Sequence, residues 1–188
     1  SGFDGTIDLS GVGDKQRLLV DAVAQNARLE GPPPIAIGRA IINADVVLYD
    51  QPQIVADVQL AETTRDALSI AVARAKIDYR NGQGTAQIMA EGRNGVPFKV
   101  AGNAAFTPDM WRIAAKGRAN SIDFETDGPV RIALQGDSYR ILPSSVKVGR
   151  GGNVRVAGVY GDAIDIQSRL ENVHIGILNP MLPDIGVG

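Results

Sequence analysis

Apolar residues recur at every second position over most of this 188-residue chain. Two clear runs are Val96 to Phe106, where Lys99 and Asn103 stand between apolar neighbours, and Trp111 to Ala119. Successive side chains of a β-strand point to opposite faces, so this alternation predicts strands with one apolar and one polar face. An amphipathic helix would instead place apolar residues three and four positions apart. The pattern therefore predicts an all-β protein.

Turn signals separate these runs. The dipeptides Asn81-Gly82, Asn94-Gly95 and Asp127-Gly128 favour tight hairpins, because Asn, Asp and Gly adopt positive φ readily. Glycine-rich stretches at Gly149–Gly152 and Gly161-Asp162 have the same character. Together they indicate roughly a dozen short strands at intervals of about 8–12 residues, a spacing typical of all-β architecture. Successive strand-turn-strand stretches resemble one another only loosely, so no regular repeat is established.

Two stretches fit more than one structure. Lys15–Gly31 has apolar residues at both helical and strand spacing, and we predict that it is mainly a strand. Ala61–Tyr79 has a helix-forming composition and a cap-like Thr63-Thr64, while its second half alternates. We predict a short helical turn near Thr63–Leu68 that leads into a strand.

Proline marks two further stretches. In Gly31–Gly38, three consecutive prolines form a rigid start to a strand. Proline cannot sit in a central strand, so this stretch predicts a sheet edge or a crossing point. In the tail, residues 172–188, apolar residues crowd between two prolines and the alternation is lost. The tail predicts a short apolar helical turn that covers the end of a sheet.

Composition narrows the class of protein. Apolar residues make up 44% of the chain and charged residues 21%, which fits a folded chain better than a disordered one. The net charge is −2 with both signs interspersed, so we expect no nucleic-acid partner. Cysteine is absent, which excludes disulfides and thiolate metal sites. We expect no signal peptide at the start of this sequence, which could be a piece of a longer protein. No apolar run approaches the ~20 residues of a spanning helix.

Residues with catalytic potential do not form a constellation. His174 is the only histidine, so a multi-histidine metal site is excluded. No G-x-S-x-G motif frames a serine, and acidic residues such as Asp45 and Asp57 fall on polar strand faces. Arg112, Lys116 and Arg118 share one strand face, where they could meet phosphates or lipid headgroups, although a solvated face is the favoured interpretation. We expect no enzyme activity, no cofactor and no metal.

The apolar members of the alternating runs are the candidate site. If the strands lie side by side, these residues line one continuous hydrophobic groove. They are Ile42, Val46, Leu48, Ile54, Val58, Leu60, Ile88, Phe98, Val100, Trp111, Ile113, Ile122, Phe124, Val130, Ile132, Leu134, Ile141, Val146, Val148, Val154, Val156, Ile164 and Ile166.

Two long stretches carry a resemblance to a known family. One is "IDYRNGQGTAQIMAEGRNGVPFKVAGNAAFTPDMWRIAAKGRANSIDFETDGPVRI", and the other is "GGNVRVAGVYGDAIDIQSRLENVHIGILNPMLPDIGVG". Their glycine-rich hairpins, the "VPF" at Val96–Phe98 and the "LNPMLP" at Leu178–Pro183 resemble the TamB family. These proteins are the inner-membrane-anchored subunits of the translocation and assembly module of Gram-negative bacteria. The resemblance extends over nearly the whole chain.

The resemblance implies a fold, a location and partners. It implies an elongated, curved, antiparallel-rich sheet, a β-taco or open groove, with an apolar concave face and minor short helical turns. Residues 1–188 would be a single internal segment of a longer repetitive groove protein, with 172–188 as a short apolar module end. The family crosses the periplasm towards the outer-membrane barrel TamA, and it is associated with outer-membrane protein insertion and phospholipid transport. The membrane anchor would lie outside this chain.

Several functions fit such a sheet. A dozen strands about 4.8 Å apart would form a trough on the order of 50 Å long. Exposed apolar surface costs roughly 25 cal/mol per Å², so the trough must be filled by its own side chains, by another sheet or by a guest. A phospholipid acyl chain suits it, since hydrocarbon needs no directional partner. The alternatives are a chaperone-like scaffold that captures unfolded outer-membrane strands by β-augmentation, a closed β-sandwich or β-helix, and, last, an enzyme.

Overall fold

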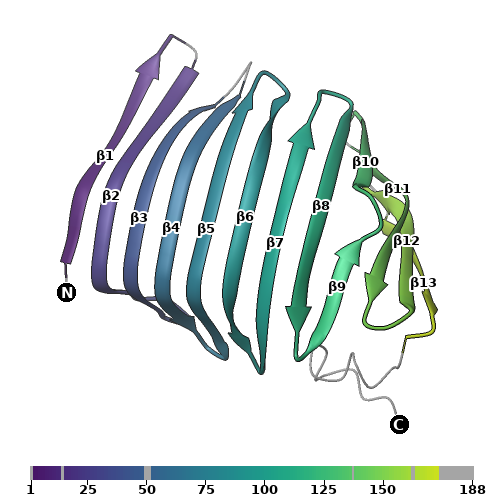
Figure 1. Ribbon diagram of the computed structural model, residues 1–188. Coiled ribbons are helices and arrows are strands. Elements are labelled where there is room, and N and C mark those ends of the chain that lie inside the picture. The colour runs from purple at the N-terminus through teal and green to yellow at the C-terminus, as the bar shows by residue number, and fades with distance from the viewer. Residues whose placement is uncertain (1, 14, 49–51, 137, 162–163, 174–188) are drawn as a thin grey trace.

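A computed structural model describes residues 2–13, 15–48, 52–136, 138–161 and 164–173. Figure 1 shows strands lying side by side in one long sheet, with no helix in the described part. The strands are β1 (Gly2–Val12), β2 (Lys15–Leu29), β3 (Ile35–Leu48), β4 (Gln53–Arg65), β5 (Leu68–Arg80), β6 (Gln83–Asn94), β7 (Val96–Phe106), β8 (Met110–Ala119), β9 (Ile122–Thr126), β10 (Val130–Gln135), β11 (Ser138–Val148), β12 (Gly152–Tyr160) and β13 (Ile164–Glu171).

Every strand pairs antiparallel with its neighbours, and the strand order follows the chain. The exception is that β9 and β10 share one position between β8 and β11. The sheet therefore has twelve positions and, at about 4.8 Å per spacing, extends about 50 Å. The predicted all-β, antiparallel, curved sheet is confirmed, and the strand in Lys15–Gly31 is β2.

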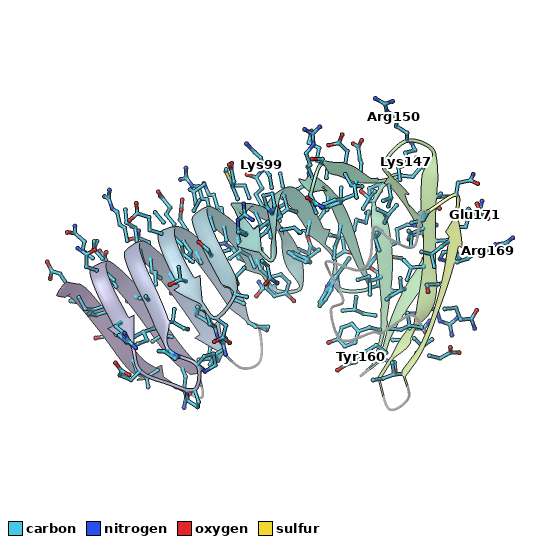
Figure 2. All side chains as sticks on the ribbon, turned by 90° about the horizontal axis from the view of Figure 1, so that it is seen from below. Lys99, Lys147, Arg150, Tyr160, Arg169 and Glu171 are labelled. Carbon is cyan, nitrogen blue, oxygen red and sulfur yellow. The ribbon has the colours of Figure 1, made fainter. Side chains whose placement is uncertain are left out.

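The register defines two faces of the sheet. We call inner the face that carries Phe106, Trp111 and Tyr160, and outer the face that carries Lys99 and Lys147. In Figure 2 the sheet bends so that Tyr160 lies on the inside of the bend and Lys99 and Lys147 on the outside. The apolar residues of the alternating runs form the inner, concave face.

The predicted helical turn at Thr63–Leu68 is wrong. β4 continues to Arg65, and a two-residue turn leads directly into β5. The alternation that would have revealed the strand is interrupted at Glu62, which has a positive φ of 51°. Leu60 and Thr63, three residues apart, pair with inner-face residues of β5, so the period of two fails at this position.

This interruption belongs to a crease that crosses β2 to β5. Asn26, Gly38, Glu62 and Ala71 lie at one level of the four strands, and none of them takes part in a register pair. On both sides of the crease the pairing resumes with the same register from β2 to β5. Each of the four strands thus has one extra, unpaired residue at the same level, and the alternation of inner and outer side chains changes phase there. Because all four strands change phase together, apolar residues stay on the inner face on both sides of the crease.

A second break separates β9 from β10. Asp127-Gly128, predicted as a hairpin, does not reverse the chain, because β9 and β10 both run antiparallel to β8. The Thr126 hydroxyl accepts a hydrogen bond from the Ala115 amide at 3.2 Å, and the Asp127 amide donates to the Ser145 carbonyl at 2.8 Å. These bonds tie the interruption to both neighbouring strands. The hairpins predicted at Asn81-Gly82, Asn94-Gly95 and Gly149–Gly152 are confirmed.

Of the two predictions made near prolines, the one for Gly31–Gly38 is wrong. The prolines of Gly31–Gly38 lie in the turn before β3, and β3 pairs on both sides, so the stretch is neither a sheet edge nor a crossing point. The reason is that the three prolines end before the first ladder pair at Ile35, so no central-strand amide is lost. The predicted helical turn of the tail, and the tip of the hairpin at Asp162, lie outside the described residues.

The sheet has almost no sealed core. The fully buried apolar residues of the described part are four alanines on the inner face, Ala22, Ala24, Ala40 and Ala119. No large side chain there is fully buried, and no second layer of described residues covers the sheet. The closed β-sandwich and the β-helix are therefore not the architecture of this part of the chain.

The inner face as a candidate apolar groove

Every residue predicted to line the groove lies on the inner face. Cross-strand partners share a face, so the register links them from strand to strand. On β3 and β4, for example, Ile42 lies opposite Val58, and on β10 and β11 Ile132 lies opposite Ile141. The same links extend the face to Ile164 and Ile166 on β13. The structure thus brings the whole predicted set together on one surface, while its contact with lipid stays a prediction.

The first part of this face is not among the predicted groove residues. Phe3, Ile7 and Leu9 of β1 pair with the inner residues of β2, so they belong to the same surface. Their signal was present, since these residues alternate with Asp, Thr and Ser. The glycines between them resembled turn residues, although Gly5 lies within the ladder opposite Ala22.

A row of aromatic rings, which was not predicted, crosses the inner face. Tyr79, Phe106, Trp111, Tyr139 and Tyr160 follow one another with ring centroids 5.8, 5.7, 5.5 and 6.5 Å apart. The first two contacts are edge-to-face, a favourable geometry for aromatic pairs. Because Tyr79, Phe106 and Tyr160 lie at or next to strand ends, the row follows one rim of the groove.

Glycine makes the close contacts of this row possible. Gly84 of β6 lies between Tyr79 and Phe106 in the register. A Cβ atom there would fall 2.6 Å from the Tyr79 Cα, so no larger residue fits without a backbone shift. Gly117 of β8 likewise leaves room for a ring, since a Cβ there would lie 2.6 Å from Cζ of Phe124. Large rings thus cover positions without side chains, which lets the inner face bend.

Large apolar side chains of the inner face remain open to solvent. Leu9 near one end of the sheet is 70% exposed and Ile164 near the other is 69% exposed. In the middle, Ile88 is 53% exposed, since its cross-strand neighbours are the small residues Ala75 and Gly102. The described groove is therefore accessible to a guest along its length.

The outer face is polar and carries ion pairs. Arg17 binds Asp45 at 2.7 Å, Arg118 binds Asp123 at 2.6 Å, and Lys147 binds Asp127 at 2.7 Å. The hydrogen bond from Arg17 lowers the pKa of Asp45, and that from Arg118 lowers the pKa of Asp123. These carboxylates stay ionised at neutral pH, so they are poor proton donors for catalysis.

A shallow hollow of about 880 Å³ lies mainly on the outer face over β5 to β9. Its walls include Arg74, Lys76 and Lys116, and Gln87 and Asn103 form part of its floor. Lys116 faces Glu125 in the register, and Arg74 is ion-paired with Asp57 at 3.1 Å. Because carboxylates face these cations, the hollow has little unbalanced charge with which to select a ligand.

The described residues contain no group of His, Cys, Asp and Glu side chains suited to a metal ion. His174 lies outside them. Within the same residues, no helix is long and apolar enough to span a membrane. The described part of the chain therefore offers a hydrophobic surface and a charged one.

The fold and this surface define a class of protein, a single-layer curved antiparallel sheet with an open apolar inner face. Searches of family models, curated proteins and solved structures find no match to this chain.

Proposed function

We propose that this chain is a segment of a groove protein that holds phospholipid acyl chains against its inner face. The observation that carries the proposal is the continuous apolar inner face, whose large side chains stay exposed and have no covering layer among the described residues. A contiguous exposed apolar surface commonly marks an interaction site. Hydrocarbon fits such a surface because its burial is favourable and non-directional.

The dimensions support an acyl-chain guest. The groove is about 50 Å long along the strand stack. The hydrocarbon core of a bilayer is about 30 Å thick, so the acyl chains of one leaflet are about 15 Å long. Several chains fit the groove, and each methylene removed from water contributes about 0.8 kcal/mol. The aromatic row at one rim adds Tyr and Trp side chains, which suit a boundary between hydrocarbon and water.

We further propose a TamB-like setting for this segment. The resemblance in the hairpins and in "VPF" supports it, and a curved antiparallel sheet is the fold that the resemblance implies. In that setting the segment lies in the periplasm as part of an inner-membrane-anchored protein and serves lipid transport and outer-membrane biogenesis. Its partners would be phospholipids and, through the longer protein, a TamA-type barrel.

Ile88 and Met89 provide a matched test of the lipid proposal. They are adjacent on β6, and Ile88 points to the inner face while Met89 points to the outer face. Both are open to solvent, at 53% and 40% exposure. An Ile88→Asp variant places a charge against bound hydrocarbon, and we expect it to weaken acyl-chain binding by about tenfold. We expect Met89→Asp to bind as the wild type does.

The measurement has two parts. Native mass spectrometry after mild extraction detects co-purified phospholipid, and displacement of a fluorescent fatty acid gives the affinity. Equal binding by the two variants would show that the inner face is not the acyl-chain site. A wild-type chain that neither retains phospholipid nor binds the fatty acid would contradict the proposal altogether.

The sheet edges favour a second candidate function, capture of unfolded outer-membrane strands. Within the described strands, β1 pairs only with β2 and β13 only with β12, so each leaves one row of backbone groups unpaired. Such an edge can accept an extended peptide by β-augmentation. An outer-membrane strand peptide should then bind in the presence of saturating fatty acid. Displacement of the peptide by fatty acid would assign it to the inner face instead.

A further inference from the structure

Two arginines face each other on the outer face of the sheet. Arg112 of β8 lies directly opposite Arg131 of β10 in the register. Arg140 of β11 lies opposite Ala133, two residues along from Arg131, and is therefore a diagonal neighbour. All three side chains are exposed. Like charges in directly opposite positions destabilise a sheet, so this arrangement calls for a physical reason.

The described residues around the three arginines do not neutralise them. Arg112 faces Ala105 on its other side, and Met110 and Ala114 flank it on the same face of β8. Arg140 faces Val159 on β12. Among the described residues, no carboxylate lies within ion-pair distance of any of the three guanidinium groups.

Another pair of opposed arginines in the same sheet shows the contrast. Arg155 of β12 lies directly opposite Arg169 of β13. There Glu171 contacts both, at 3.5 Å from Arg155 and 3.3 Å from Arg169. Figure 2 shows Arg169 and Glu171 together on the outside of the bend. The chain thus supplies an internal anion to one opposed pair, and the described structure shows none at the other.

The three arginines lie in a part of the chain that is rich in positive charge. Residues 70–160 contain 13 Lys and Arg against 7 Asp and Glu, whereas residues 1–69 contain 5 against 10. The arginine pair lies within the basic part, so the surrounding sheet attracts anions towards it.

We propose that Arg112 and Arg131, with Arg140 beside them, form a binding site for a phosphate group. Cβ atoms of directly opposite residues are about 5 Å apart, so both guanidinium groups can reach one anion. Each offers a planar fork of donors that matches the oxygens of a phosphate. The bound anion would offset the repulsion between the arginines. The phosphate could belong to a lipid headgroup or to a soluble phosphate ester, and the site lies on the opposite face from the acyl-chain groove.

The test compares Arg131→Gln with Arg155→Gln in the full chain. Inorganic phosphate is titrated at constant ionic strength, with chloride as the counter-titration, and backbone amide shifts are followed by NMR. We expect saturable shifts around residues 112, 131 and 140 in the wild type. Arg131→Gln should bind phosphate about tenfold more weakly or worse, because it loses hydrogen bonds to a charged group. Arg155→Gln, whose neighbour Arg169 keeps Glu171, should bind as the wild type does.

A stability measurement separates binding from a structural role. Without phosphate, Arg131→Gln should unfold at the same temperature as the wild type or a higher one, since it relieves like-charge repulsion. Phosphate should then raise the Tm of the wild type more than that of the variant. A variant that unfolds earlier than the wild type without phosphate would mean that Arg131 stabilises the sheet, which contradicts the proposal.

Vesicles distinguish the two sources of phosphate. Sedimentation with phosphatidylcholine vesicles that contain phosphatidylglycerol, lost in Arg131→Gln, would assign a lipid headgroup. Phosphate binding without vesicle binding would assign a soluble phosphate ester. Equal weakening in Arg131→Gln and Arg155→Gln would show unspecific attraction to the basic surface and overturn the site. Absence of both phosphate-dependent shifts and vesicle binding in the wild type would overturn it as well.

Discussion

Phe106 is the second of the five rings in the aromatic row and touches a ring on each side, so its removal tests what holds the rim of the groove together. Its ring meets Tyr79 at 5.8 Å and Trp111 at 5.7 Å, both edge-to-face, and Gly84 leaves no other side chain between Tyr79 and Phe106. A fully buried Phe→Ala change costs about 3–5 kcal/mol. Phe106 is partly exposed, so somewhat less than that applies, and its two ring pairs contribute about 0.5–1.5 kcal/mol each. Since these terms overlap, we expect Phe106→Ala to lower the free energy of unfolding by about 2–4 kcal/mol.

The assay is urea unfolding followed by circular dichroism and by the fluorescence of Trp111, the only tryptophan. Both probes are needed because Phe106 touches the fluorophore. Tyr160→Ala is the control, since Tyr160 is 54% exposed and has one ring neighbour in the row, at 6.5 Å. It should lose less than half as much free energy. If both variants lose the same amount, ring contacts within the row are not the source of the stability.

Two other changes test the packing of the inner face and the ion pairs of the outer one. Gly117→Ala would push a Cβ against Phe124 and the Lys99 carbonyl, so it should lower the free energy of unfolding in urea by about 1–3 kcal/mol. The control is Gly11→Ala, which has no described atom within 4 Å of the new Cβ and should change the free energy of unfolding by less than about 1 kcal/mol. Similar losses in the two variants would contradict the close packing at Gly117. The pKa of Asp45 is lowered by Arg17, so their pair stabilises the fold above the ordinary carboxyl pKa of about 4 and is lost as the pH falls through the lowered value. Arg17→Gln should therefore be slightly less stable than the wild type at pH 7 in low salt, and a difference that persists at pH 2 would exclude the ion pair as its cause.

Strands were predictable from this sequence wherever the period of two held. The run from Val96 to Phe106 became β7 with the expected faces, because alternation alone decides which side chains meet the concave surface. The prediction failed at Thr63–Leu68 because the phase changes at Glu62. That change is intelligible only beside Gly38 and Ala71 on the neighbouring strands, which lie at the same level of the sheet. Pairing between strands carries this information, and local sequence does not.

The site was predictable in part for the same reason. Alternation identified inner-face residues such as Ile132 and Val156 without knowledge of the strand order. The aromatic row was not predictable, because Tyr139 and Tyr160 come into contact only through the pairing of β11 with β12. Likewise, Arg112 lies opposite Arg131 only because β9 and β10, on either side of the break, both pair with β8.

The sparse core explains how one sheet can be both stable and receptive. Each strand of the described part pairs only with its sequence neighbours or, around the break, with β8 and β11. Stability in such an arrangement is close to a sum of nearest-neighbour terms, as in repeat proteins, so it needs no second layer. Alanines are the residues sealed on the inner face, while Ile88 and its larger neighbours keep surface in contact with water. A guest that covers this surface therefore gains the free energy of its burial. Because a guest that binds only the folded sheet also stabilises it, a higher occupancy of the groove should raise the stability of the folded chain.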